Sequence, residues 1–129
     1  MMSDSDVCDC SAAPSLIFAC SGAADVGELA DLAARKLTCE GAGQMFCLAG
    51  VGGRVSGIMD KTKAARNVLA VDGCPLDCAR LTLEQAGITN VAHLRVTDLG
   101  LEKGKSPATP DTVAKVAKEA EALLSQAGS

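Results

Sequence analysis

The pattern of apolar and polar residues divides the chain into alternating strand-like and helix-like segments. Residues 16–20, 44–49 and 68–72 form short, nearly continuous apolar runs. Such runs are typical of strands that are buried on both faces, as in a parallel sheet. Residues 91–96 instead alternate between apolar and polar side chains, which predicts a strand at the sheet edge with one face in solvent.

Helical periodicity fills the intervals between these predicted strands. In the first interval, apolar residues recur three and four positions apart, at Val26, Leu29, Ala30, Ala33 and Leu37. The segments predicted to be helical cover residues 25–38, 60–66, 75–86 and 109–124. Because strand and helix alternate, the sequence predicts an α/β fold: a single-domain, doubly wound sheet of about four parallel strands with helices on both faces.

Length, charge and composition narrow the class of protein. The 129 residues fit one domain, which we expect at residues 15–129, after a polar N-terminal tail at residues 1–14. The net charge is −4 without a basic block, so we expect no nucleic-acid partner. We expect no membrane partner either, because no apolar run reaches the roughly 18 residues of a membrane span. The acidic N-terminus is unlike a signal peptide, which predicts a cytoplasmic protein.

Seven cysteines carry the candidate chemistry. Three predicted strands run into Cys20, Cys47 and Cys74, and Cys78 follows four residues after Cys74. The carboxyl ends of parallel strands meet at one edge of a sheet, so we expect these four sulfurs there together. Neighbouring strands lie about 4.8 Å apart, and sulfurs on a tetrahedral zinc lie about 3.8 Å apart. The sequence therefore predicts a metal site, although each cysteine alone also fits a small buried core residue.

Four further residues are candidates for supporting roles. Arg54 is a candidate charge partner for the thiolates, and Asp72 is expected in the surroundings of the ligands. Cys8 and Cys10, on the N-terminal tail, are candidates for additional thiols. A second metal, a resolving thiol and no role at all stay open for this pair.

Cys39 and His93 are expected outside the site. Cys39 lies near the end of the first predicted helix, which runs back along the strands and carries it about 20 Å away. His93, the single histidine, falls on the polar side of the alternating strand, so we expect it to face solvent.

Four stretches of the chain together resemble the DGC-domain family, which is named for the motif Asp72-Gly73-Cys74. These stretches are residues 18–23, 47–54, 72–78 and 98–106. The resemblance covers nearly everything after the tail, and it implies four chelating cysteines and zinc binding but no settled activity. We assign the chelating positions to Cys20, Cys47, Cys74 and Cys78.

The expected function is that of a small metal-binding protein whose thiolates hold zinc in a structural, handling or sensing role. A closed shell of four thiolates leaves no position for water, which argues against hydrolysis. One alternative is a thiol redox or sulfur-transfer enzyme, with Cys74 as nucleophile and Cys78 as resolving thiol. Another is an iron–sulfur protein, because four cysteinates also ligate such clusters. The last is a partner-binding module with Lys103 and Lys105 on its contact surface, for which the sequence names no protein partner.

Overall fold

The computed structural model describes residues 14–127 and contains a four-stranded parallel sheet. The strands are β1 (Ser15–Ala19), β2 (Gln44–Met45), β3 (Asn67–Asp72) and β4 (Val91–Arg95). Their order across the sheet is β2-β1-β3-β4, and each pair of neighbours is parallel. The predicted α/β class and the edge position of the alternating strand β4 are confirmed.

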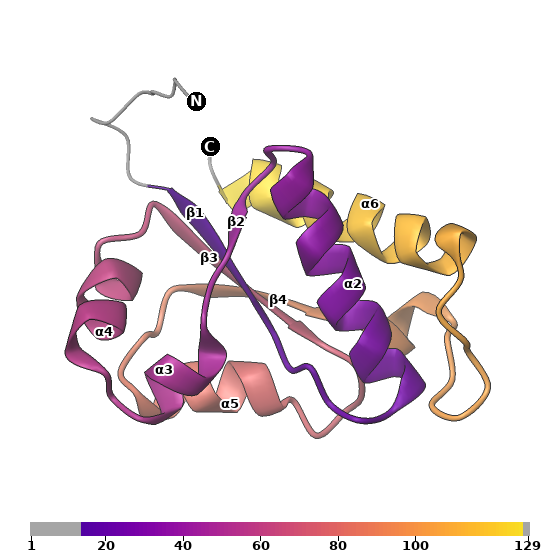
Figure 1. The fold of residues 1–129 in the computed structure, drawn as a ribbon, viewed down its shortest axis with the longest axis horizontal. Coiled ribbons are helices and arrows are strands. Elements are labelled where there is room, and N and C mark those ends of the chain that lie inside the picture. Colours follow the sequence, from indigo (N-terminus) through magenta and orange to yellow (C-terminus); the bar gives the residue numbers. More distant parts are fainter. Residues whose placement is uncertain (1–13, 128–129) are drawn as a thin grey trace.

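Helices cover both faces of the sheet, as the sequence predicts. They are α2 (Asp25–Cys39), α3 (Leu48–Gly52), α4 (Ser56–Lys63), α5 (Cys78–Gln85) and α6 (Pro110–Ala127), with a 3-10 turn η1 (Val96–Leu99) after β4. Figure 1 shows α2 and α6 on one side of the strands and α3, α4 and α5 on the other. Within residues 14–127, none of the helices is long and apolar enough to cross a membrane.

Alternate residues of the two central strands supply two separate cores. Ile17 and Leu69 point to one face and pack with α2 and α6, whereas Phe18 and Ala70 point to the other face and pack with α3, α4 and α5. This division follows from the twofold repeat of side-chain direction along a strand. Since both faces are covered, the two strands are apolar over residues 16–19 and 68–71, and the hydrophobic effect holds the helices against them. The ends of β1 and β3 are fixed in space as a result.

The second strand is shorter than the sequence suggests. It ends at Met45, and Cys47 then adopts an extended backbone conformation directly before α3. The Cys47 sulfur accepts the Gly50 N–H at 3.3 Å and thereby caps the start of α3, a helix that was not predicted from the sequence. Two of the five residues of α3 are glycines, which have low helix propensity, so the periodicity of the sequence does not indicate this helix.

Helices α4 and α5 also begin at other residues than predicted. Helix α4 begins at Ser56 rather than residue 60, directly after a residue with an extended backbone. Helix α5 begins at Cys78 rather than Pro75, because Asp77 has φ 55° and ψ 44°. These are left-handed angles, which a right-handed helix does not include. The shift leaves Cys74 in a loop and Cys78 on the first turn of α5.

Candidate functional site at the carboxyl edge of the sheet

The two central strands end side by side at the carboxyl edge of the sheet. Strand β1 pairs with β3 over its whole length, from Ser15 with Asn67 to Ala19 with Val71. The chain passes from β1 outward to β2 and then back past β1 to β3, and ligand-binding crevices form where the strand order reverses in this way. Cys20 and the DGC loop, defined as residues 73–77, directly follow these two strands.

Close packing of the DGC loop explains the glycine at its first position. A Cβ atom on Gly73 would lie 2.7 Å from backbone atoms of Val26 and Gly27, at the start of α2. The Gly73 N–H donates to the Cys20 sulfur at 3.3 Å, and the Gly73 carbonyl accepts the N–H of Thr97 at 3.2 Å. The central residue of the DGC motif therefore joins the loop to α2, to the end of β1 and to η1.

Asp72 caps helix α5 from the end of β3. Its residue surface is 1% exposed, and its carboxylate accepts the N–H of Ala79 at 2.7 Å and that of Arg80 at 3.1 Å. Both N–H groups belong to the first turn of α5, where no carbonyl of the helix itself can accept them. Asp77 directly precedes the helix but its side chain makes no cap hydrogen bond, so Asp72 takes this role. Strand β3 and helix α5 are thus connected across the DGC loop.

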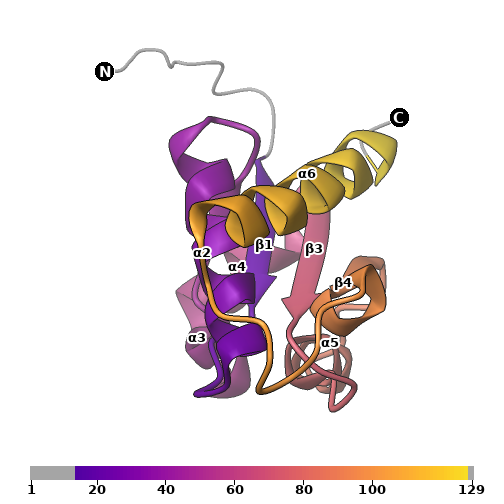
Figure 2. The same ribbon diagram turned by 90° about the vertical axis from the view of Figure 1, so that its right-hand side faces the viewer.

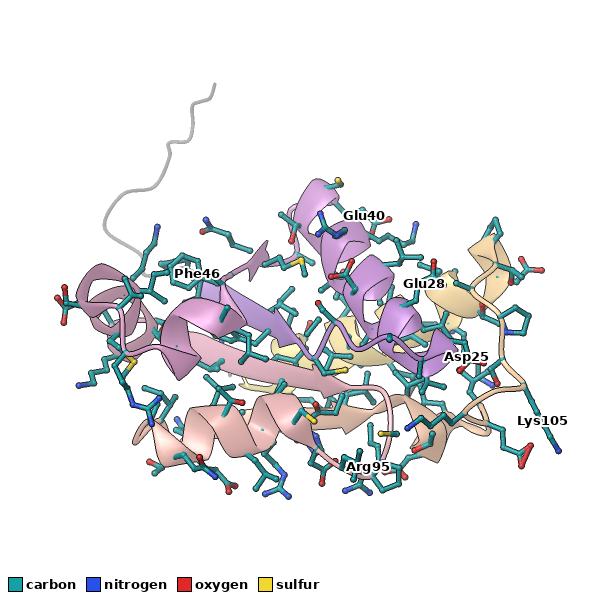
Figure 3. The ribbon with its side chains drawn as sticks, turned by 60° about the horizontal axis from the view of Figure 1, so that its bottom comes forward. Asp25, Glu28, Glu40, Phe46, Arg95 and Lys105 are labelled. Atoms are coloured by element: carbon teal, nitrogen blue, oxygen red, sulfur yellow. The ribbon has the colours of Figure 1, made fainter. Side chains whose placement is uncertain are left out.

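A second buried carboxylate, Asp77, is held by two arginines. Arg95 donates from Nε to Oδ1 at 2.9 Å and from Nη2 to Oδ2 at 2.7 Å, and Arg80 donates from Nη2 to Oδ2 at 3.1 Å. Figure 3 shows Arg95 beside the start of α5. The hydrogen bonds from Arg95 are the main reason why the pKa of Asp77 is lowered to about 2, and the same contact raises the pKa of Arg95. The pair therefore stays ionised at neutral pH.

His93 contacts these carboxylates, which corrects the expectation that it faces solvent. Its Nε2 lies 2.9 Å from Asp72 Oδ2 and 3.6 Å from Asp77 Oδ1, and its side chain is 19% exposed. The polar side of β4 faces the start of α5, since His93 and Arg95 pair in register with Ala70 and Asp72 of β3. What reads as a solvated strand face is a partly buried polar cluster.

Asp72, Asp77 and His93 form the one group, within the described part of the chain, whose three metal-ligating side chains come within 4.8 Å of one another. Each carboxylate oxygen in this group already accepts an N–H or guanidinium hydrogen bond of 3.1 Å or less. Two arginines also supply the positive charge that a cation would supply. We interpret the group as an ion-pair network that fixes the DGC loop and the start of α5.

Cys20 and Cys47 line the same surface depression, which has a volume of about 720 Å³. Cys20 is half-buried and Cys47 is exposed. Each sulfur accepts one backbone N–H at 3.3 Å, from Gly73 and from Gly50 respectively.

Cys74 and Cys78 lie in and directly after the DGC loop. Cys74 is half-buried, and the ammonium nitrogen of Lys103 lies 4.0 Å from its sulfur. Cys78 is exposed and is the first residue of α5. The positive end of the helix dipole favours a negative charge at such a position.

The spacing of the sulfurs differs from that of a closed zinc shell. Across residues 14–127, no three cysteine sulfurs come within 4.8 Å of one another, whereas sulfurs on a tetrahedral zinc lie about 3.8 Å apart. Cys20 shares a depression with Cys47 and is joined to the DGC loop through Gly73. The four sulfurs are not gathered around one point in this structure.

Backbone strain is concentrated around these cysteines. In the described chain, three residues other than glycine have positive φ: Ser21 at 51°, Arg54 at 58° and Asp77 at 55°. Ser21 directly follows Cys20, and Asp77 directly precedes Cys78. Such conformations persist only where the surrounding structure enforces them, and they cluster at functional sites.

Arg54 links two helices of the site. Its guanidinium donates to the carbonyls of Val51 and Gly52 at 2.8 and 3.2 Å, and to that of Gln85 at 3.0 Å. Helix α3, which follows Cys47, is thereby tied to the last residue of α5. The expected role of Arg54 as a charge partner for thiolates stays a prediction.

The other cysteines lie away from this edge or outside the structure described. Cys39 is the exposed last residue of α2, at the far end of that helix from Asp25. Cys8 and Cys10 fall outside the described residues.

Sequence reasoning did not identify Asp77, His93 and Lys103 as neighbours of the candidate site. A signal for His93 was present, because the alternation of β4 puts it on the same side as Arg95. No comparable signal existed for Lys103, whose position depends on how a long loop folds.

Comparisons with known proteins agree with the DGC motif. A model of the DGC domain matches residues 16–120. The chain is 38% identical, over 88 residues, to the anaerobic and virulence modulator AnvM of Pseudomonas aeruginosa; the alignment covers 68% of this chain and 67% of AnvM. No solved structure matches the chain. Because the family model matches most of the chain and AnvM is 38% identical to it, the chain belongs to the DGC domain family.

Proposed function

We propose that this protein binds zinc through the thiolates of Cys20, Cys47, Cys74 and Cys78 at the carboxyl edge of its sheet. The observation that carries the proposal is the pair of backbone N–H groups directed at the sulfurs of Cys20 and Cys47, each at 3.3 Å. Donors of this kind surround metal-bound thiolates and orient them. Both residues also line one depression, into which an ion could enter from solvent.

The chemistry of the four cysteines fits zinc, but their spacing requires movement. Since no three of the described sulfurs lie within 4.8 Å of one another, binding would require the four cysteine side chains to turn toward a common point. Strands β1 and β3 would stay in place, because both cores hold them. Four thiolates would form a closed shell, so bound zinc would serve structure, metal handling or sensing rather than hydrolysis.

Two residues support the proposed ligands without contacting the ion. Asp72 holds the first turn of α5, which carries Cys78. Arg54 holds α3, which begins directly after Cys47, against the end of α5. Each therefore limits how far one of the four cysteines can drift from the others.

The similarity to AnvM favours a sensing role over a purely structural one. AnvM is named as a modulator, and a modulator needs a site that changes with conditions. Zinc thiolates meet this need, because oxidation of the sulfurs releases the metal.

The test is the metal content of protein purified without added metal. We expect about one zinc per chain in the wild type, as four thiolates complete one tetrahedral shell. Serine at each of the positions Cys20, Cys47, Cys74 and Cys78 should abolish or strongly reduce this content. The matched control is Cys39→Ser, which changes an exposed cysteine at the far end of α2 and should retain the zinc. Metal-free wild-type protein would contradict the proposal, and a coloured protein containing iron would indicate an iron–sulfur cluster instead.

A second candidate function, thiol–disulfide exchange, is favoured by the position of Cys78 at the start of α5 and by the ammonium group near Cys74. The Cys74 thiolate would attack a substrate disulfide and release one thiol. Cys78 would then displace the second thiol, so that the substrate is reduced and the cysteine pair is oxidised. This function predicts one cysteine that alkylates much faster than the others in metal-free protein, and uniformly slow alkylation would exclude it.

A further inference from the structure

The loop between η1 and α6 is fastened to the start of α2 by a single carboxylate. Asp25 Oδ1 accepts the N–H of Gly104 at 2.8 Å, and Asp25 Oδ2 accepts the N–H of Ser106 at 2.9 Å. These two hydrogen bonds are the main reason that the pKa of Asp25 is lowered. We call residues 100–107 the lysine loop. In Figure 2 this orange segment descends to the end of the molecule at which β1 and β3 finish, beside the start of α2.

The lysine loop also has a fixed internal structure. The Ser106 hydroxyl accepts the N–H of Glu102 at 2.7 Å, and Ser106 is 7% exposed. Gly100 and Gly104 have φ of 82° and 88°, angles that other residues rarely adopt. Glu102 is thus held by Ser106, and Gly104 and Ser106 are held by Asp25. Lys103, which lies between Glu102 and Gly104, is therefore held at a defined place.

The two lysines of this loop have different surroundings. The ammonium nitrogen of Lys103 lies 4.0 Å from the Cys74 sulfur. Lys105 lies 3.6 Å from Glu102, and Figure 3 shows it extending away from the domain. The two residues share a loop, a charge and exposure to solvent, so they differ chiefly in their distance from the cysteine.

We infer that Lys103 is the charge-balancing residue of the thiolate site, and that Asp25 positions it by fastening the lysine loop. The inference rests on the proposed zinc site, since four thiolates around one Zn²⁺ carry a net charge of −2 that nearby positive charge must offset. Arg54, the candidate from the sequence, has its guanidinium on three backbone carbonyls. Lys103 brings its full charge to a ligand sulfur.

The first experiment measures zinc affinity by competition with a chromophoric chelator, using the full-length protein. A unit charge about 4 Å away in water-like surroundings changes such an equilibrium about fivefold. Lys103→Gln should therefore weaken zinc binding about fivefold at low salt, and less at high salt because the charge is screened. The control Lys105→Gln should leave the affinity unchanged. Asp25→Asn should also weaken zinc binding. Combining it with Lys103→Gln should cause little further loss of zinc affinity.

The second experiment does not need the metal, so it separates a failure of this inference from a failure of the proposed function. Metal-free protein is treated with iodoacetate, which is anionic, or iodoacetamide, which is neutral, and the modification of Cys74 is followed by peptide mass spectrometry. Lys103 should attract the anion, so Lys103→Gln should lower the iodoacetate-to-iodoacetamide rate ratio at Cys74 about fivefold. The ratio at Cys39 should stay constant, as should the ratio at Cys74 in Lys105→Gln. An equal ratio in Lys103→Gln and wild type would overturn the inference, whether or not zinc binds.

Discussion

Two polar clusters around the DGC loop are bonded very differently. On one side, the carboxylates of Asp72 and Asp77 are 1% and 5% exposed and accept hydrogen bonds of 2.7 to 3.1 Å at every oxygen. On the other, the sulfurs of Cys20 and Cys47 accept one N–H each at 3.3 Å, and both line an open depression. We call these the carboxylate cluster and the sulfur cluster.

The difference indicates that the two clusters have different roles. Short, charge-assisted hydrogen bonds to buried carboxylates are among the stronger polar interactions in proteins. A single backbone hydrogen bond to a sulfur contributes less to folding than these bonds and leaves most of the atom available. The carboxylate cluster therefore holds the loop in place, and the sulfur cluster stays free to bind a ligand.

The largest effect on stability is expected from a substitution of Gly73, which directly follows Asp72 and donates its N–H to the Cys20 sulfur. In Gly73→Ala the new methyl group would lie 2.7 Å from the backbone of α2, which cannot rotate away as a side chain can. We expect a loss of about 2 to 3 kcal/mol in the free energy of unfolding. The control is Gly57→Ala in α4, where nothing lies within 4 Å of the added carbon and alanine should be neutral or slightly stabilising. Equal urea midpoints for the two variants would mean that the close packing at Gly73 is not needed.

Removal of the Asp72 carboxylate should have the next largest effect. Asp72→Ala leaves the N–H of Ala79 buried without an acceptor and uncaps α5, which should cost about 2 kcal/mol. Asp60→Ala, which removes an exposed aspartate from α4, should change stability by about 0.5 kcal/mol or less. Both are measured by urea unfolding at neutral pH, and a loss as small as that of the Asp60 variant would contradict the capping role.

The pH dependence of stability should report the Asp77–Arg95 pair. The pKa of Asp77 is about 2 in the folded protein against an ordinary value of 3.8, so the folded state binds a proton less readily than the unfolded state. The resulting stabilisation is complete above about pH 4 and is lost as the pH falls toward 2. On the order of 1 to 2 kcal/mol should disappear in this window. Asp77→Asn should flatten the profile there, and an unchanged profile would assign the acid sensitivity to other groups.

The smallest effect on stability is expected in the sulfur cluster. Serine at position 47 can still accept the Gly50 N–H that caps α3, so Cys47→Ser should stay within about 0.5 kcal/mol of the wild type. The same variant should lose the proposed zinc. If instead its stability fell as far as that of Asp72→Ala in metal-free protein, the division between the clusters would be wrong.

The periodicity of apolar residues in the sequence predicted most of the fold. Buried strands such as residues 68–72 give a clear apolar run, and the alternation of residues 91–96 marked the edge strand. The short helix at Leu48–Gly52 was missed because its start depends on a sulfur cap, and the start of α5 because one aspartate adopts left-handed angles. Such local devices leave no periodic trace in a sequence.

The candidate site was predictable only as far as strand ends determine position. The winding of the sheet brings Cys20 beside the DGC loop, as the sequence implied. It does not determine where the Lys103 side chain lies, since that depends on the contacts of Asp25 with a loop about 80 residues away in the chain. His93 was misjudged because a polar strand face can be covered by the start of a helix as well as by water.

Zinc K-edge X-ray absorption of the purified protein tests the central proposal most directly. We expect a shell of four sulfurs at about 2.3 Å in the wild type and in Cys39→Ser, and one sulfur fewer around any zinc that Cys74→Ser retains. A shell dominated by nitrogen and oxygen at about 2.0 to 2.1 Å would contradict it, and would assign the metal to Asp72, Asp77 and His93 instead.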